Sequence, residues 1–103
     1  MRKSKAQKEQ EDLDAVFKAL AHPSRRQILL VLLFRGGQMT AGQIAERFSC
    51  AWPTTTRHLG VLEAAGLIQV EKRGRERVYL LDKNRIESVL GDWMQWFRNQ
   101  DAQ

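Results

Sequence analysis

Cysteine is nearly missing from this sequence, which has a single one, Cys50, among its 103 residues. One cysteine excludes an internal disulfide and any metal site built from several thiolates. Long apolar runs are missing too: none approaches the ~18 residues that a membrane-spanning helix needs, and the charged N-terminus has no secretory leader. We therefore expect a cytoplasmic protein without a membrane partner.

Acidic residues are in the minority, with 12 aspartates and glutamates against 17 lysines and arginines, so the net charge is +5. This balance favours a polyanionic partner, although net charge alone does not identify one. The length corresponds to one domain, which buries one modest core rather than a core with a deep substrate cleft. Hydrophobic residues at 43% are close to the globular average, which excludes wholesale disorder.

Candidate catalytic groups are also scarce. Two histidines and scattered acids assemble no serine–histidine–aspartate set, no phosphate-binding glycine loop and no pair of inward carboxylates. The run from Thr54 to Thr56 lacks a neighbouring base that would activate a hydroxyl. We therefore expect that the protein is not an enzyme and uses no cofactor.

What is present begins with a basic segment. Residues 1–8 carry four lysines and arginines, no acid and no apolar periodicity, which predicts a disordered arm, either a solvated tail or a DNA contact. Residues 9–103 then form one domain. Its first helix begins at Glu9 and has apolar residues every three or four positions, at Leu13, Val16, Phe17 and Leu20.

Proline, glycine and capping residues mark the next helix ends. Pro23 suits the first turn of a second helix, which is apolar nearly all round and therefore buried. His22 before it is expected to cap that helix or to pack. Thr40 and Gln43 form a capping-box pattern at the start of a third helix. A fourth helix begins at Pro53, ends at a glycine, and exposes polar and basic groups opposite its apolar face.

The hydrophobic period then changes from 3.6 to 2. Two alternating runs around Arg73-Gly74-Arg75 predict a β-hairpin, and Asp82 or Asn84 caps a last helix. That helix has more aromatic residues than a small core needs, which predicts a seam between two copies of the chain. The residues expected in this seam are Val16, Phe17, Leu20, Leu90, Trp93, Trp96 and Phe97.

This order of elements predicts a mainly α fold with a small β-hairpin: a winged helix-turn-helix of five helices plus a two-stranded wing. A recognition helix needs one apolar face for the core and one face of short polar and basic groups for the major groove of double-stranded DNA. A basic hairpin tip contacts phosphates or the minor groove. The candidate DNA-binding residues are Trp52, Thr54, Thr55, Thr56, Arg57 and His58 on the helix and Lys72, Arg73, Arg75 and Arg77 on the wing.

Four segments carry a family resemblance: VFKALAHPSRRQILLVLL (16–33), MTAGQIAERF (39–48), PTTTRHLGVLEAAGLI (53–68) and EKRGRERVYLL (71–81). Together they resemble ArsR-type bacterial repressors over about residues 11–99. The resemblance implies a nucleoid-associated transcriptional repressor, a homodimer joined by its first and last helices, that binds an imperfect palindrome in a promoter. It places recognition-helix contacts at Thr54, Thr56, Arg57 and His58, and the wing at residues 73–77.

Departures from the family pattern bear on regulation. Metal-sensing members carry a cysteine motif around the third helix, or Asp, His and Glu sets on the last helix. Here the third helix has no cysteine and the last has no histidine, so we expect no metal site. Cys50 is expected to be a small, partly buried residue in a turn, and it leaves a metal- or redox-responsive sensor repressor as an alternative. A winged helix used for protein–protein contact is another, which Arg57, His58 and the basic wing disfavour. The sequence does not identify a small-molecule or protein effector.

The start of the recognition helix also departs from the pattern. Ala51 stands where the family has serine, which predicts a weakened helix cap. Trp52 beside it either contacts a thymine methyl group or sugar, or packs into the turn. Thr55 stands where the family has a core valine.

Overall fold

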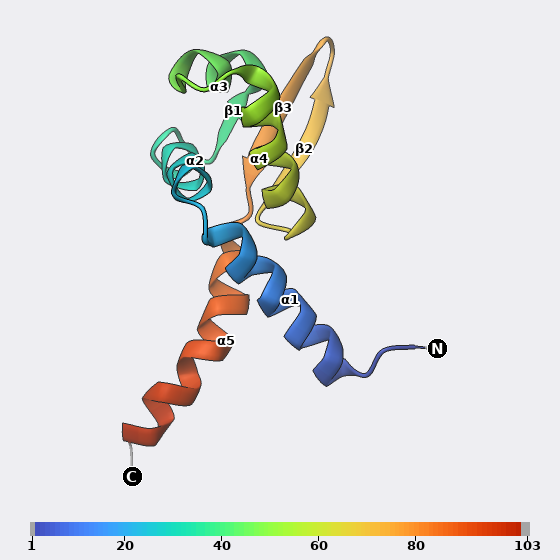
Figure 1. The fold of residues 1–103 in the computed structure, drawn as a ribbon, viewed down its shortest axis with the longest axis vertical. Coiled ribbons are helices and arrows are strands. Elements are labelled where there is room, and N and C mark those ends of the chain that lie inside the picture. Colours follow the sequence, from blue (N-terminus) through green and yellow to red (C-terminus); the bar gives the residue numbers. More distant parts are fainter. Residues whose placement is uncertain (1, 102–103) are drawn as a thin grey trace.

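The computed structural model describes residues 2–101, which form five helices and three strands (Figure 1). This architecture confirms the predicted winged helix-turn-helix. No helix among these residues has the length and apolar character needed to cross a bilayer. The elements are α1 Lys5–Leu20, α2 Pro23–Phe34, β1 Gln38–Thr40, α3 Ala41–Arg47, α4 Trp52–Ala64, β2 Ile68–Arg73, β3 Glu76–Leu81 and α5 Lys83–Asp101.

The predicted two-stranded wing is confirmed, and the sheet contains one further strand that the sequence did not predict. β2 and β3 form the expected hairpin, with Arg73 opposite Glu76, and Gly74 in its turn has a φ of 62°, which suits glycine. β1 adds to the other edge of β3, with Met39 opposite Tyr79. The sequence did not predict β1, because its three residues are too few to show an alternating pattern.

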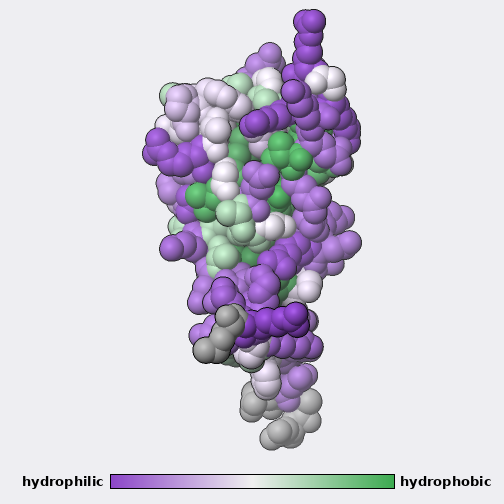
Figure 2. Space-filling view, turned by 90° about the vertical axis from the view of Figure 1, so that its right-hand side faces the viewer, coloured by the Kyte–Doolittle hydropathy of each residue, from purple (hydrophilic) through white to green (hydrophobic). Residues whose placement is uncertain are grey.

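The core lies where α2 and α4 pack against the sheet and α1 packs against both of these helices. Its fully buried side chains come from every one of these elements and from α3: Val16, Leu32, Ile44, Leu59, Leu62, Leu67 and Ile68. Figure 2 shows hydrophobic residues in the upper half of the molecule, framed by hydrophilic ones that reach its top, where the hairpin tip lies. The DNA-binding elements are thus held by one small core.

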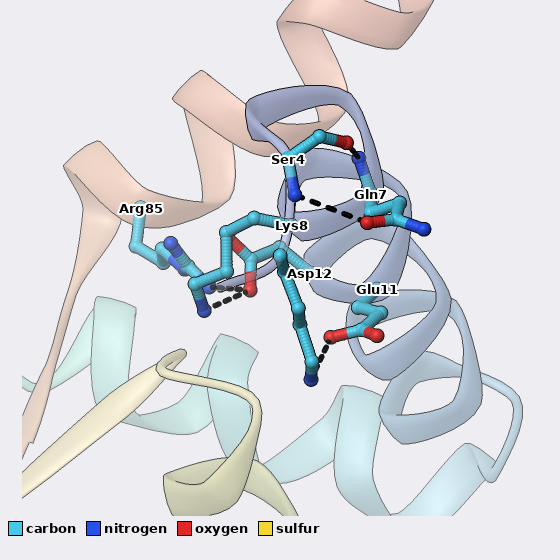
Figure 3. A network of polar contacts seen from close by, with 7 residues as sticks. Ser4, Gln7, Lys8, Glu11, Asp12 and Arg85 are labelled. Carbon is cyan, nitrogen blue, oxygen red and sulfur yellow. Dashed lines mark hydrogen bonds and ion pairs between the residues drawn. The ribbon is translucent and has the colours of Figure 1, made fainter. Parts of the chain in front are cut away.

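α1 begins earlier than the sequence predicts, at Lys5 rather than Glu9. Ser4 and Gln7 form a capping box, in which Ser4 Oγ accepts from the Gln7 amide at 3.1 Å and Gln7 Oε1 accepts from the Ser4 amide at 3.0 Å (Figure 3). Residues 5–8, predicted as part of a disordered arm, are therefore helical. The prediction was based on the basic composition and the lack of apolar periodicity, and it overlooked the capping box that Ser4 and Gln7 form.

Asp12 of α1 forms ion pairs within its own helix and with the last helix. Lys8 Nζ donates to Asp12 at 2.9 Å, and Arg85 of α5 reaches the same carboxylate at 3.5 Å (Figure 3). The hydrogen bond from Lys8, followed by the charge of Arg85, holds the pKa of Asp12 below its ordinary value against the opposing effect of burial. α1 and α5 meet here and diverge from the body as a V (Figure 1).

Candidate nucleic-acid interface

α4, the predicted recognition helix, begins without a side-chain cap. Its N-cap residue is Ala51, which makes no side-chain hydrogen bond, as the sequence predicts. Pro53 follows within the first turn, where its missing N–H costs nothing. Thr56 Oγ1 donates to the carbonyl oxygen of Trp52 at 2.8 Å, which orients this side chain along the first turn.

The exposed face of α4 carries most of the expected DNA-contacting groups. Trp52, Thr56 and Arg57 are exposed, and Thr54 is half-buried. Thr55 is only 2% exposed and faces the core, so its inclusion among the DNA contacts was wrong. Successive residues of an α-helix are about 100° apart around its axis. Thr55 is therefore rotated away from its exposed neighbour Thr56, toward the side of α4 that faces the core.

His58 also differs from its expected place. It is half-buried, its ring centroid lies 4.4 Å from that of His22, and Arg25 Nη1 lies 3.4 Å from its Nδ1. The side chain is thus directed at the start of α2 rather than the groove face. His22 itself caps α2, because its Nδ1 accepts from the Ser24 amide at 3.2 Å; the predicted capping role is confirmed.

The hairpin presents its basic residues to solvent. Lys72, Arg73, Arg75 and Arg77 are all exposed. Arg73 donates twice to Glu71 Oε2, at 3.1 and 2.9 Å, so one acid offsets part of its charge. Lys72 and Arg77 are opposite each other in the β2–β3 register, which concentrates positive charge across the ribbon.

A hollow of about 350 Å³ separates the start of α4 from the wing. Trp52 and Thr56 line it from the helix, while three cations and one acid line it from the hairpin: Lys72, Arg75, Arg77 and Glu76. The fold therefore brings the aromatic and hydroxyl groups of the helix next to the cations of the wing. This concave, cationic surface has the chemistry needed to hold a sugar–phosphate backbone.

Cys50 lies in the turn between α3 and α4, as expected, but it is exposed, so its expected partial burial was wrong. It lines a second hollow, of about 330 Å³, with Arg47 and His58. Arg25, which contacts His58 and the end of α1, was missed by the sequence reasoning. In the sequence, Arg25 is notable only for its position two residues after Pro23, where α2 begins. That position does not show what the side chain contacts.

The expected seam residues fall into two groups. Val16 has no exposed surface and belongs to the core of the single subunit, so its place in the seam was wrong. Phe17 and Trp93 contact edge-to-face at 5.1 Å, and Trp93 and Phe97 do so at 5.0 Å. Trp96 and Phe97 are nevertheless 69% and 57% exposed on α5. Leu20 and Leu90 are half-buried.

Comparisons with known proteins give related sequences and folds. Residues 20–71 match a family model described as a helix-turn-helix domain. Transcriptional repressor SdpR of Bacillus subtilis is 39% identical over 87 residues, covering 84% of this chain and 90% of that protein. A crystal structure of an ArsR family transcriptional regulator superposes with a TM-score of 0.77 at 29% identity, covering 97% of this chain and 95% of that one. A solution structure of a homodimeric winged helix-turn-helix DNA-binding domain from Mycobacterium bovis has a TM-score of 0.71 at 21% identity and shares 97% and 90% of the two chains.

Proposed function

Because this chain belongs to the ArsR-type family of winged helix-turn-helix transcriptional regulators, we propose that it is a homodimeric repressor that binds an imperfect palindrome in a promoter. It acts in the cytoplasm by binding DNA and carries out no catalysis. The observation that supports this function best is the arrangement of α4 and the wing, which exposes polar and cationic groups around one hollow.

We assign sequence recognition to the exposed residues of α4. Arg57 presents a guanidinium that can form a bidentate pair with guanine, and Thr54 and Thr56 present short side chains that fit the major groove. Trp52 lies at the boundary between groove and wing, where an indole can contact a thymine methyl group or a sugar. Thr55 and His58 are left out, because one is buried and the other faces α2.

We assign sequence-independent affinity to the wing. Lys72, Arg75 and Arg77 line the hollow beside α4 from the hairpin, and Arg73 adds a charge that Glu71 partly offsets. Phosphate contacts position the protein on DNA and add affinity that falls with salt.

The aromatic seam supports a dimer; we use this name for Phe17, Leu20, Leu90, Trp93, Trp96 and Phe97. A single subunit leaves Trp96 and Phe97 largely in water, although such side chains favour burial. A two-fold partner contributing the same surface would cover them. It would also present two recognition helices to half-sites about one helical turn apart.

In vitro selection from a random duplex library tests this function. We expect a consensus with two inverted half-sites whose centres are about 10 base pairs apart. A matched control is the variant Arg57→Ala carried through the same selection, which should enrich a weaker consensus. Enrichment of no sequence, or of a single unrepeated half-site, would contradict the proposed function.

A further inference from the structure

Two histidines that are far apart in the sequence meet behind the recognition helix. The rings of His22 and His58 are 4.4 Å apart, and Arg25 Nη1 lies 3.4 Å from Nδ1 of His58. Arg25 also donates to the carbonyl oxygens of Ala19 and Lys18 at the end of α1, at 2.6 and 3.0 Å. One guanidinium thus contacts α1 and α4 from its place on α2. We call His22, Arg25 and His58 the helix joint.

Both imidazoles of the helix joint act as hydrogen-bond acceptors. His22 Nδ1 accepts from the Ser24 amide at 3.2 Å. A guanidinium can only donate, so the nitrogen of His58 that faces Arg25 must carry a lone pair. A proton on this nitrogen of His58 would replace an acceptor by a donor that faces the guanidinium of Arg25.

The surroundings of His58 oppose a positive charge. Arg25 faces it from α2, Arg57 belongs to its own helix, and Arg47 and Cys50 line the hollow that His58 also lines. No carboxylate lines that hollow within the described residues. Burial, and then the charges of His22, Arg25 and Arg57, hold the pKa of His58 below its ordinary value.

Building on the DNA-binding function above, we propose that Arg25 and His58 are positioning residues for the recognition helix, and that protonation of His58 lowers discrimination between operator and other DNA. An imidazolium at residue 58 repels Arg25, so α4 loses its fixed orientation relative to α1. α1 belongs to the aromatic seam, so the two recognition helices of the dimer lose their mutual register.

The added charge has a second effect that must be separated from the first. A positive charge near DNA strengthens binding to any sequence through the phosphates. Loss of the orientation of α4 weakens binding to the operator alone. The quantity to measure is therefore the ratio of the two affinities, in which the general electrostatic gain cancels.

The experiment uses the full chain and two duplexes of equal length. One is the consensus selected in vitro at pH 7.5, and the other is its scrambled sequence. At constant ionic strength, we expect the ratio of affinities to fall roughly five- to tenfold between pH 7.5 and 5.5, toward the low end of usual allosteric couplings. Histidine is the side chain with an ordinary pKa in this interval, and the chain has two.

Three variants identify the responsible group. His58→Gln keeps an acceptor for Arg25 but cannot be charged, so its ratio should be the same at both pH values. His58→Lys carries a permanent charge, so its ratio should be low at both. His22→Asn retains a good N-cap for α2 and should keep the pH dependence. Circular dichroism confirms that each variant is folded.

The possible failures are distinguishable. A wild-type ratio that does not change with pH would overturn the role of the helix joint, as would an equal fall in His58→Gln. Selection that yields no consensus at pH 7.5 would instead overturn the proposed DNA-binding function, whatever the histidines do.

Discussion

Removing the two most exposed aromatic residues of the seam is expected to convert the proposed dimer into folded monomers. Trp96 and Phe97 are 69% and 57% exposed in the single subunit. Each such side chain has about 200 Å² of surface, so the pair exposes roughly 250 Å² per subunit. At about 25 cal/mol per Å², full burial would stabilise the dimer by about 6 kcal/mol per subunit. Two subunits together would gain about 12 kcal/mol from full burial. If only a quarter of that burial occurs, its loss weakens the dimer by about 3 kcal/mol, which raises the dissociation constant more than a hundredfold.

The double variant Trp96→Ala, Phe97→Ala should therefore sediment as a monomer at micromolar concentration. A monomer has one recognition helix and loses the effective concentration that a linked second half-site provides, so its operator affinity should approach the non-specific range of about 10⁻⁴–10⁻⁶ M. Analytical ultracentrifugation and a gel shift measure the two effects, with circular dichroism as the test of folding.

Phe34→Ala is a matched control, because Phe34 is exposed on α2 and lies outside the aromatic seam. It should leave both the dimer and operator binding unchanged. The reasoning fails if the double variant is folded and still dimeric, or if it is monomeric and still binds its operator tightly.

Four further predictions concern the helix, the wing, stability and metals. Arg57→Ala should reduce discrimination between operator and random duplexes by about 1–3 kcal/mol, whereas Arg75→Ala should weaken both equally and lower the salt slope by about one per half-site; the reverse pattern in binding titrations would contradict this division. Ala51→Ser should supply the missing cap of α4 and raise the free energy of unfolding by about 1 kcal/mol in urea titrations, and no change would show that the cap is satisfied otherwise. As pH falls below about 6.5, the unfolded state binds a proton at His58 before the folded state does, so stability should fall in wild type but not in His58→Gln. The contribution of Asp12, whose pKa is lowered, should be complete above its unfolded pKa and be lost as the pH falls through its folded pKa. Stoichiometric zinc, cadmium or arsenite should leave operator affinity unchanged, and a tenfold weakening that is absent in Cys50→Ser would revive a sensor function.

The sequence by itself determined the order of the helices and the hairpin. Changes of hydrophobic period from 3.6 to 2, with Pro23 and Gly74 at element boundaries, are local properties that neighbouring residues express without help from the rest of the chain. The capping pattern of Thr40 and Gln43 was likewise confirmed, because both partners lie within one turn. Local patterns of this kind were also enough to predict α4 and the β2–β3 hairpin, the two elements expected to contact DNA.

Only the tertiary structure decided which side chains of those elements face outward. Val16 and Thr55 lie on helices with more than one apolar or polar face, and the crossing of α1, α2 and α4 determined which face is buried. The pairing of β1 with β3 and the meeting of His22 with His58 join residues more than 30 positions apart. Periodicity gives the angular position of a residue on its own helix, but its neighbours across the interface depend on how the helices cross, which no local pattern encodes.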